Sequence, residues 1–222
     1  MEWLIPAIKL NKLLRSGQFI KIEKDEIIRS SEKNDRFYLL TKGYVKRYMI
    51  TNDGSIDIQS FYGPGYFLPL ITVFKGFFEQ EIYSGPETYY YEAMTYSELY
   101  FTDISTVVAQ AETDPQIYRE LLMISGRRLG ANIQQIENRS LRTFYNRVAH
   151  QIAFLSEVFS NRSGDMAKLK IPLTQQDLAD SLSTTRETVS LCMSNLKKNN
   201  LIITGKYITV PSIKKLKKEA FK

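Results

Sequence analysis

The sequence has 222 residues, of which 43% are hydrophobic and 24% are charged. This composition is typical of a globular protein with one large domain or two modest ones, and it excludes wholesale disorder. Cys192 is the only cysteine, which excludes an intramolecular disulfide and any multi-cysteine metal site. No apolar run approaches the roughly 20 residues of a membrane span, and residues 1–14 lack the pattern of a secretory signal. We therefore expect a soluble cytoplasmic protein with no membrane partner.

The charge of the chain is unevenly distributed. Residues 1–145 contain 17 basic and 18 acidic residues, whereas residues 146–222 contain 13 basic and 6 acidic residues. A basic excess confined to one third of the chain favours a polyanion-binding module attached to a neutral one. A solubilising tail would give a similar count, because Lys214, Lys215, Lys217 and Lys218 alone supply four charges. The residue pattern has to decide between the two.

The segment from Phe19 to about Phe101 is rich in short β-branched and aromatic runs separated by turn residues. Asp53-Gly54, between two such runs, predicts a hairpin with a primed two-residue turn. Many short strands with this punctuation indicate a sandwich or a barrel. Eleven of the 14 tyrosines lie between Tyr38 and Tyr100, which indicates an aromatic core or an aromatic pocket.

A helical period begins near Pro115. One apolar stripe has the spacing of a coiled-coil seam, and a second stripe lies on another face of the same helix. Two apolar faces predict that one packs on its own domain and that the other meets a second copy of the chain; the alternative is a helix buried within a monomer. The predicted dimer seam consists of Leu122, Gly126, Leu129, Ile133 and Ile136, the second stripe of Ile117, Leu121 and Ile124, and Asn138-Arg139-Ser140 form a predicted hinge.

The next helix is predicted to run through Val148, Ile152 and Leu155 and to end in a loop at residues 161–164. Thr174 with Asp177 then resembles a capping box that opens a short helix. A three-residue break at 183–185 caps a second helix over residues 185–199. Two short helices at this spacing predict a helix-turn-helix, and the glycine-containing run at 201–210 predicts a hairpin wing. The inner faces of the two helices are formed by Leu178, Ala179 and Leu182 and by Val189, Cys192, Met193 and Leu196.

The outer face of the second helix carries the candidate DNA contacts, because a helix in the major groove reads base edges from its first turns. Contacts to phosphates would fix the register without carrying sequence information. The predicted base-reading residues are Arg186, Glu187, Ser190 and Leu191, and the predicted phosphate contacts are Thr184, Thr185, Ser194, Lys197 and Lys206.

Leu173–Val210 resembles the winged-helix domain of the cyclic-AMP receptor protein and fumarate–nitrate regulator (Crp/Fnr) superfamily, most closely at residues 185–190. Residues 37–46 and 65–67 resemble two turns of that family's β-roll. The resemblance implies an α+β protein with a cyclic-nucleotide-binding-like β-roll (jelly roll) at 1–112, a dimerisation helix and hinge at 113–140, and a winged-helix domain at 141–222. It also implies a homodimeric transcription regulator that binds double-stranded DNA. The family's habit favours an activator, which would contact RNA polymerase.

The chain departs from the family where cyclic nucleotides bind. The family's Gly-Glu pair is replaced by Pro69-Leu70, its Arg-Ser or Arg-Thr pair aligns near Glu87-Thr88, and no basic residue lies between Lys75 and Arg119. We therefore expect no use of cyclic AMP. The chain also lacks the N-terminal cysteines of the iron–sulfur members. Its only histidine, His150, lies outside the β-roll, so neither a cluster nor haem is expected, and no other metal site is evident.

Two interpretations of the β-roll remain open. It binds an uncharged or aromatic effector, or it has become a structural body with a collapsed pocket. The residues of the candidate effector pocket are Phe67, Leu68, Leu70, Tyr89, Tyr90 and Tyr91.

The function also has alternatives. Many relatives have an arginine at the position of Leu191, so the half-site is expected to differ from theirs. An interaction module with degenerate DNA binding is one alternative, and a redox or haem sensor, with Cys192 as a redox switch, is another. An enzyme is not expected, because the sequence has no phosphate-cradling glycine loop, nucleophile elbow or zinc-protease motif.

Overall fold

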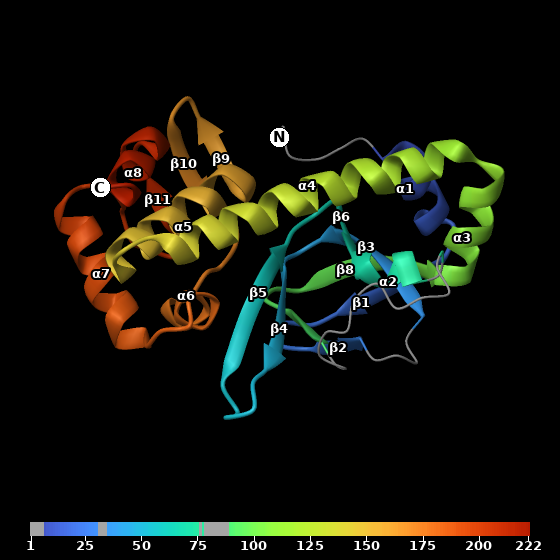
Figure 1. Ribbon diagram of the computed structural model, residues 1–222, viewed down its shortest axis with the longest axis horizontal. Coiled ribbons are helices and arrows are strands. Elements are labelled where there is room, and N and C mark those ends of the chain that lie inside the picture. The colour runs from blue at the N-terminus through green and yellow to red at the C-terminus, as the bar shows by residue number, and fades with distance from the viewer. Residues whose placement is uncertain (1–6, 31–34, 76, 78–88) are drawn as a thin grey trace. The chain divides into compact units, whose positions relative to one another are not determined.

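The computed structural model describes residues 7–30, 35–75, 77 and 89–222. The chain forms two compact units, residues 1–49 with 60–130 and residues 50–59 with 131–222 (Figure 1). We call them the β-unit and the C-terminal unit. The predicted boundaries at 112 and 140 fall near helix ends, whereas the two units divide within the long helix α4 (Pro115–Ser140).

The β-unit is built on two four-stranded sheets, with the strand orders β1-β8-β3-β6 and β2-β7-β4-β5. The pairings β1–β8, β3–β8, β3–β6, β2–β7 and β4–β7 are antiparallel. The predicted β-sandwich is therefore confirmed. The strands are β1 (Gln18–Ile22), β2 (Ile27–Ser30), β3 (Arg36–Lys42), β4 (Val45–Ile50), β5 (Ile56–Tyr62), β6 (Tyr66–Leu68), β7 (Tyr89–Ala93) and β8 (Ser97–Asp103).

Strand β3 is buried on both faces, because helices cover one side of its sheet and the second sheet covers the other. Phe37 and Leu39 join one core cluster with Leu10, Leu14 and Leu121 from the helices. The alternate residues Tyr38 and Leu40 join a second cluster with Val45, Tyr62 and Tyr91. The sequence pattern did not predict three helices of this unit, namely α1 (Ile8–Arg15), α2 (Leu70–Lys75) and α3 (Ile104–Thr113).

The hairpin between β4 and β5 is confirmed, but its predicted turn type is wrong. The loop runs from Thr51 to Ser55, and of its residues only Gly54 has a positive φ, at 82°. The Asp53 carboxylate accepts a hydrogen bond from the Ser55 amide at 3.1 Å, and the Thr51 amide donates to the Ser55 carbonyl at 2.9 Å. These bonds stabilise a longer loop than a primed two-residue turn would need.

The C-terminal unit contains the predicted helix pair and a small sheet of order β11-β10-β9. The loop predicted at 161–164 is wrong in part, because Asn161, Arg162 and Ser163 belong to β9, which pairs with β10, and only Gly164 is a turn residue. The elements are α5 (Phe144–Val158), β9 (Ser160–Ser163), β10 (Met166–Leu169), α6 (Gln175–Ser181), α7 (Arg186–Lys198), β11 (Thr209–Val210) and α8 (Ile213–Ala220).

None of the helices in the described part of the chain is long and apolar enough to cross a membrane.

Candidate nucleic-acid interface

Helix α6 begins at the predicted capping box. The Thr174 hydroxyl accepts a hydrogen bond from the Asp177 amide at 3.0 Å, and the Asp177 carboxylate accepts from the Thr174 amide at 3.0 Å. Two amides that would otherwise be free at the helix start are thereby satisfied. The cap fixes where α6 begins and therefore which side of it faces α7.

The turn between α6 and α7 is short because its backbone takes an uncommon conformation. Ser183 has φ of 50°, and the Thr184 amide donates to the Ala179 carbonyl at 3.0 Å. Ala179 is fully buried, and its small side chain lets the two helices approach closely. Thr185 caps α7 by accepting from the Thr188 amide at 3.2 Å. The predicted helix-turn-helix is confirmed.

Helix α7 separates its two faces as predicted. Val189, Cys192, Met193 and Leu196 are all buried. On the outer face Arg186, Glu187 and Leu191 are exposed, Leu191 by 65%, and Ser190 is half-buried. All four predicted base-reading residues therefore lie on one accessible side of the helix, spaced so that they share a face.

The predicted phosphate contacts differ in what they have left to donate. Lys197 and Lys206 are exposed cations, and Lys206 lies in the wing turn, 5.8 Å from the Tyr207 ring centroid. The Ser194 hydroxyl, in contrast, donates to the Ser190 carbonyl at 2.9 Å, so its proton is already used within the helix. Thr185 serves the helix cap, and Thr184 is half-buried. The two lysines are thus the best-placed phosphate donors of the set.

The wing is narrower than the sequence predicted. Ile203 and Thr209 exchange two backbone hydrogen bonds of 2.8 and 2.9 Å, and this single bridge closes the loop that carries Lys206. Beyond the bridge, Val210 in β11 pairs with Ala167 in β10. The wing is therefore the outer part of a three-stranded sheet whose strand β9 the sequence did not predict.

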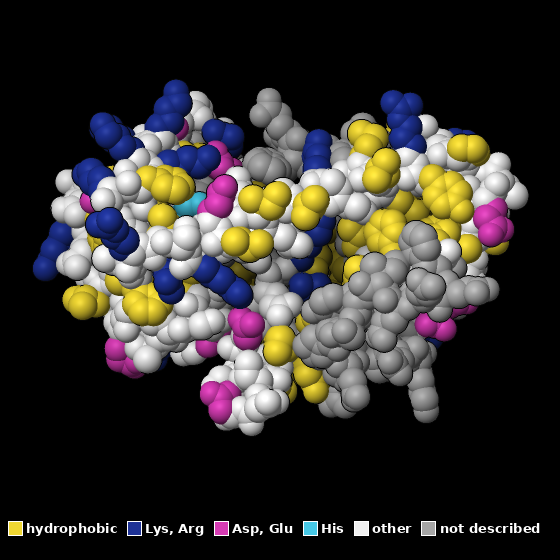
Figure 2. Space-filling model, viewed as in Figure 1, with side chains coloured by type: hydrophobic (Ala, Val, Ile, Leu, Met, Phe, Trp, Pro, Cys, Tyr) yellow, Lys and Arg dark blue, Asp and Glu magenta, His cyan; other side chains and the backbone are white. Residues whose placement is uncertain are grey.

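Helix α8 adds basic residues that were taken for a possible tail. It begins at Ser212, whose hydroxyl accepts from the Lys215 amide at 3.1 Å, and it buries Ile213, Leu216 and Ala220. That spacing of apolar residues was the available signal for a helix. Figure 2 shows basic side chains gathered over the end of the molecule that holds α7 and α8. The exposed lysines of α8 are Lys214, Lys215 and Lys218.

The predicted seam on α4 is exposed within the chain. Leu122, Leu129, Ile133 and Ile136 have exposed fractions of 71%, 61%, 47% and 67%, and nothing lies within 4 Å of a Cβ built on Gly126. Figure 2 shows hydrophobic side chains along the course of this helix. The second stripe is buried in the β-unit core as predicted: Ile117 and Leu121 are almost fully covered, and Ile124 packs against them.

The six residues of the candidate effector pocket are not brought together. Phe67 and Leu70 belong to the core cluster under the helices, whereas Leu68, Tyr89 and Tyr91 belong to the cluster between the sheets. Successive residues of β6 point to opposite faces of the sheet, so Phe67 and Leu68 cannot line one cavity. Tyr90 stacks on Tyr48 with ring centroids 5.2 Å apart.

The remaining sensing candidates are structural residues. His150 is buried in α5, its ring lies 5.5 Å edge-on to Phe221, and burial lowers its pKa. Burial raises the pKa of the Cys192 thiol, which makes it less reactive. Within the described ranges, no cluster of three histidine, cysteine or acidic side chains could hold a metal ion.

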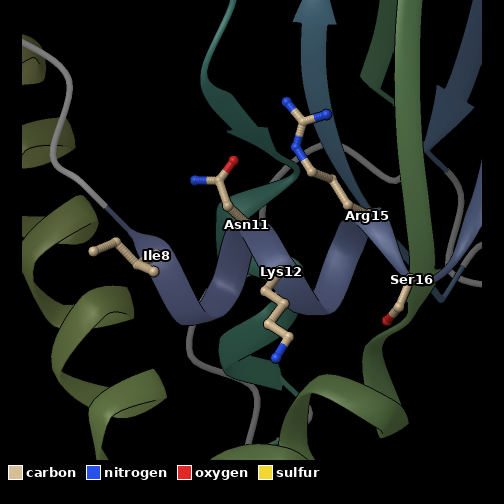
Figure 3. A pocket seen from close by; sticks show the side chains of 5 residues that line it. All are labelled: Ile8, Asn11, Lys12, Arg15 and Ser16. Carbon is tan, nitrogen blue, oxygen red and sulfur yellow. The ribbon is translucent and has the colours of Figure 1, made fainter.

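An open pocket lies along α1, lined by Ile8, Asn11, Lys12, Arg15 and Ser16. Asn11 and Arg15 lie on one side of the helix and Lys12 on the other (Figure 3). The Asn11 side chain donates to the Ala7 carbonyl at 2.8 Å. Because its polar groups do not converge, this pocket is a weaker candidate for function than α7.

Comparisons with known proteins agree with this geometry. Residues 146–219 match the model of the Crp-like helix-turn-helix domain. The chain is 23% identical to the CRP-like cAMP-activated global transcriptional regulator of Mycobacterium tuberculosis over 195 residues, 87% of this chain and 84% of that protein. It is 27% identical to nitrogen fixation regulation protein FixK of Rhizobium meliloti over 180 residues, 80% of this chain and 74% of that protein.

Among solved structures, FixK2 from Bradyrhizobium japonicum is similar with a TM-score of 0.72 at 22% identity, covering 90% of this chain and 94% of that one. A Crp/Fnr-family transcriptional regulator from Thermus thermophilus is similar with a TM-score of 0.68 at 21% identity, covering 91% and 98%. The C-terminal region is therefore a Crp-like helix-turn-helix domain. The chain is a transcription regulator of the Crp/Fnr type, a family of regulators and not of enzymes.

Proposed function

We propose that the chain acts as a homodimer that binds a palindromic DNA site through α7 and activates transcription from it. The observation that carries the proposal is the outer face of α7. Arg186 and Glu187 are exposed at the start of a helix whose inner face is fully packed. The first turns of such a helix are the part that reaches base edges when it lies in the major groove.

The exposed stripe on α4 supports the dimer. Four large apolar side chains and a glycine recur at heptad spacing over residues 122–136. A seam of this kind is normally covered by a second helix with the same pattern, and the same helix from a second copy supplies it. Two copies would present two α7 helices, which read two half-sites about 34 Å apart.

Lys197 and Lys206 would contact the DNA backbone on either side of the base-reading residues. The other predicted phosphate contacts, Thr184, Thr185 and Ser194, would add weaker hydrogen bonds. Leu191 would contact a thymine methyl group or a sugar, since it has no hydrogen-bonding group. As an activator the dimer would also contact RNA polymerase.

We further propose that the regulator does not use cyclic AMP, haem or an iron–sulfur cluster. In the family, the residue pair at 69–70 is Gly-Glu, and its glutamate holds the ribose. Here Pro69 is buried and has no amide hydrogen, and Leu70 opens α2. Isothermal calorimetry with cyclic AMP should detect no binding tighter than about 10 µM, or about −7 kcal/mol. A visible absorption spectrum of the purified protein should lack a Soret band.

The DNA-binding proposal is tested by selection from random duplex DNA followed by a salt titration on the winning site. Enrichment of a palindrome, with an affinity that falls a hundredfold or more between about 50 and 200 mM salt, is expected for a dimer with many phosphate contacts. Failure to enrich any sequence would contradict it and would favour an interaction module that no longer reads DNA, for which the exposed Leu191 is the structural hint.

A further inference from the structure

The β-unit holds arginine side chains among its core tyrosines. Arg128, on α4, donates through Nη2 to the Tyr62 hydroxyl at 3.0 Å and to the Ser60 hydroxyl. Its guanidinium carbon lies 4.9 Å from the centroid of the Tyr62 ring. Tyr62 is only 4% exposed. In the described part of the chain, these contacts of Arg128 are to neutral groups and include no carboxylate.

Two further arginines act on the same tyrosines. Arg47, on β4, is half-buried, lies 4.7 Å from the centroid of the Tyr89 ring and forms a hydrogen bond with Tyr91. Arg127, which precedes Arg128, has a buried Nη1 atom for which the described residues supply no hydrogen-bond partner. Strand β4 and helix α4 therefore bring three guanidinium groups to one cluster of rings.

The rings of this cluster form an aromatic wall. Tyr62 has its ring centroid 5.9 Å from those of both Tyr66 and Tyr91, edge-on to the first and tilted to the second. Tyr91 is 2% exposed. The wall is flat and largely apolar, and the arginines are the cationic groups that face it.

The electrostatics of Tyr62 show the sign of the field at this place. Burial by itself raises the pKa of Tyr62, but the charges of Arg128 and Arg47 outweigh it, so the pKa lies below its usual value. At Tyr66 burial dominates and raises the pKa to about 12. The position beside Tyr62 therefore favours a negative charge.

Several like charges in a partly desolvated site repel one another and have lost hydration, so an anion placed between them is strongly stabilised. Guanidinium groups bind carboxylates in a fork geometry, and tyrosine rings pack against flat apolar bodies. We propose that the β-unit binds a small aromatic carboxylate between Arg47, Arg127 and Arg128 and the rings of Tyr62, Tyr66 and Tyr91. The proposal concerns binding by the β-unit and does not require that α7 binds DNA.

This proposal replaces the uncharged ligand expected from the sequence. The search for a cation there was confined to residues 75–119, where the family has its arginine, and that window holds none before Arg119. The arginines of the cluster come from β4 and α4, which lie outside the window. They supply the charge without the ribose-binding glutamate, which fits a small anion better than a nucleotide.

The test uses the full chain without DNA and compares benzoate with its neutral isostere benzamide by isothermal calorimetry. Benzoate should bind with a dissociation constant of about 1 mM or tighter, and benzamide at least tenfold more weakly. Arg128→Gln and Arg127→Gln should each weaken benzoate binding at least fivefold. Arg127→Gln is included because the variant loses no hydrogen bond at Nη1, so its fold should persist if Arg128→Gln unfolds.

Arg15→Gln is the matched control. Arg15 also lies over a tyrosine, 5.4 Å from the Tyr100 ring centroid, but it is exposed on α1. It should leave benzoate binding unchanged. Equal binding of benzoate and benzamide, or an equal loss in Arg15→Gln, would overturn the proposal. Inorganic phosphate or cyclic AMP binding more tightly than benzoate would overturn the assignment to an aromatic carboxylate.

Discussion

The two units keep their polar chemistry in different places. In the C-terminal unit the charged side chains of α7 lie on the outside of a helix whose inner face is apolar, so they are free to meet a large partner. In the β-unit the guanidinium and phenol groups lie among core residues, so only a small molecule can reach them. Substitutions should therefore separate stability from binding on α7 and should couple the two in the β-unit.

The largest expected effect tests that separation with two leucines of α7. Leu196 is fully buried and Leu191 is 65% exposed. Leu196→Ala should lower the free energy of unfolding by about 2–5 kcal/mol, because it leaves a cavity. Leu191→Ala should change it by less than about 0.5 kcal/mol. Urea denaturation measures both, and a comparable loss in the two variants would contradict the assignment of the faces.

A somewhat smaller effect concerns the exposed stripe on α4. Leu129→Lys places a charge in each half of the proposed seam, and it should weaken self-association by about 2–4 kcal/mol if both ammonium groups become desolvated. Sedimentation would show monomers at concentrations where the unmodified chain is dimeric, and binding to the palindrome should fall with it. Ile8→Lys is the control, since Ile8 is 71% exposed but lies on α1. Dissociation in both variants would point to a nonspecific effect of charge.

On the DNA-binding face, one arginine and one lysine should behave differently. Arg186→Ala should lose about 1–3 kcal/mol of discrimination at one base position, because a base contact carries sequence information. Lys206→Ala should instead weaken binding to all sequences alike and reduce the salt dependence. Competition assays on the selected site and its single-base variants measure both. A uniform loss in Arg186→Ala would mean that this residue contacts a phosphate.

The helix-turn-helix could be predicted because its signals are local. Thr174 and Asp177 form the cap within three residues of each other, and the buried positions of α7 follow from the helical period. Strand β9 was missed because Ser160-Asn161-Arg162-Ser163 has no β-branched or aromatic residue. Its extended form comes from pairing with β10, as in Lys168 opposite Asn161.

The arginine–tyrosine cluster could not be predicted from local pattern. Arg47, Tyr62, Tyr91 and Arg128 are far apart in the chain, and each by itself has the sequence context of an ordinary strand or helix residue. Only the packing of β4, β5, β7 and α4 brings them together. The same limit explains why the candidate pocket failed, because Phe67 and Leu68 are neighbours in sequence and lie in different clusters.

The smallest expected effect concerns a buried polar group of the C-terminal unit. His150 is 8% exposed in α5, and the described residues supply no hydrogen-bond partner for its Nδ1 atom. Burial, with the Lys217 charge, lowers its pKa despite the opposing charges of Glu137 and Glu157. The unfolded chain therefore binds more protons than the folded one just below the unfolded pKa of about 6.5.

Stability should then be complete above that pH and should fall as the pH drops below it, by at most about 1.4 kcal/mol per pH unit. His150→Phe removes the titration and keeps an aromatic ring against Phe221, so its stability should change less with pH between about 5 and 7. Urea denaturation of both chains across that range measures the difference. The same slope in both would show that another group controls it, whereas a flatter curve in the variant would identify His150 as a buried group of this unit that lacks the several partners of the arginines in the β-unit.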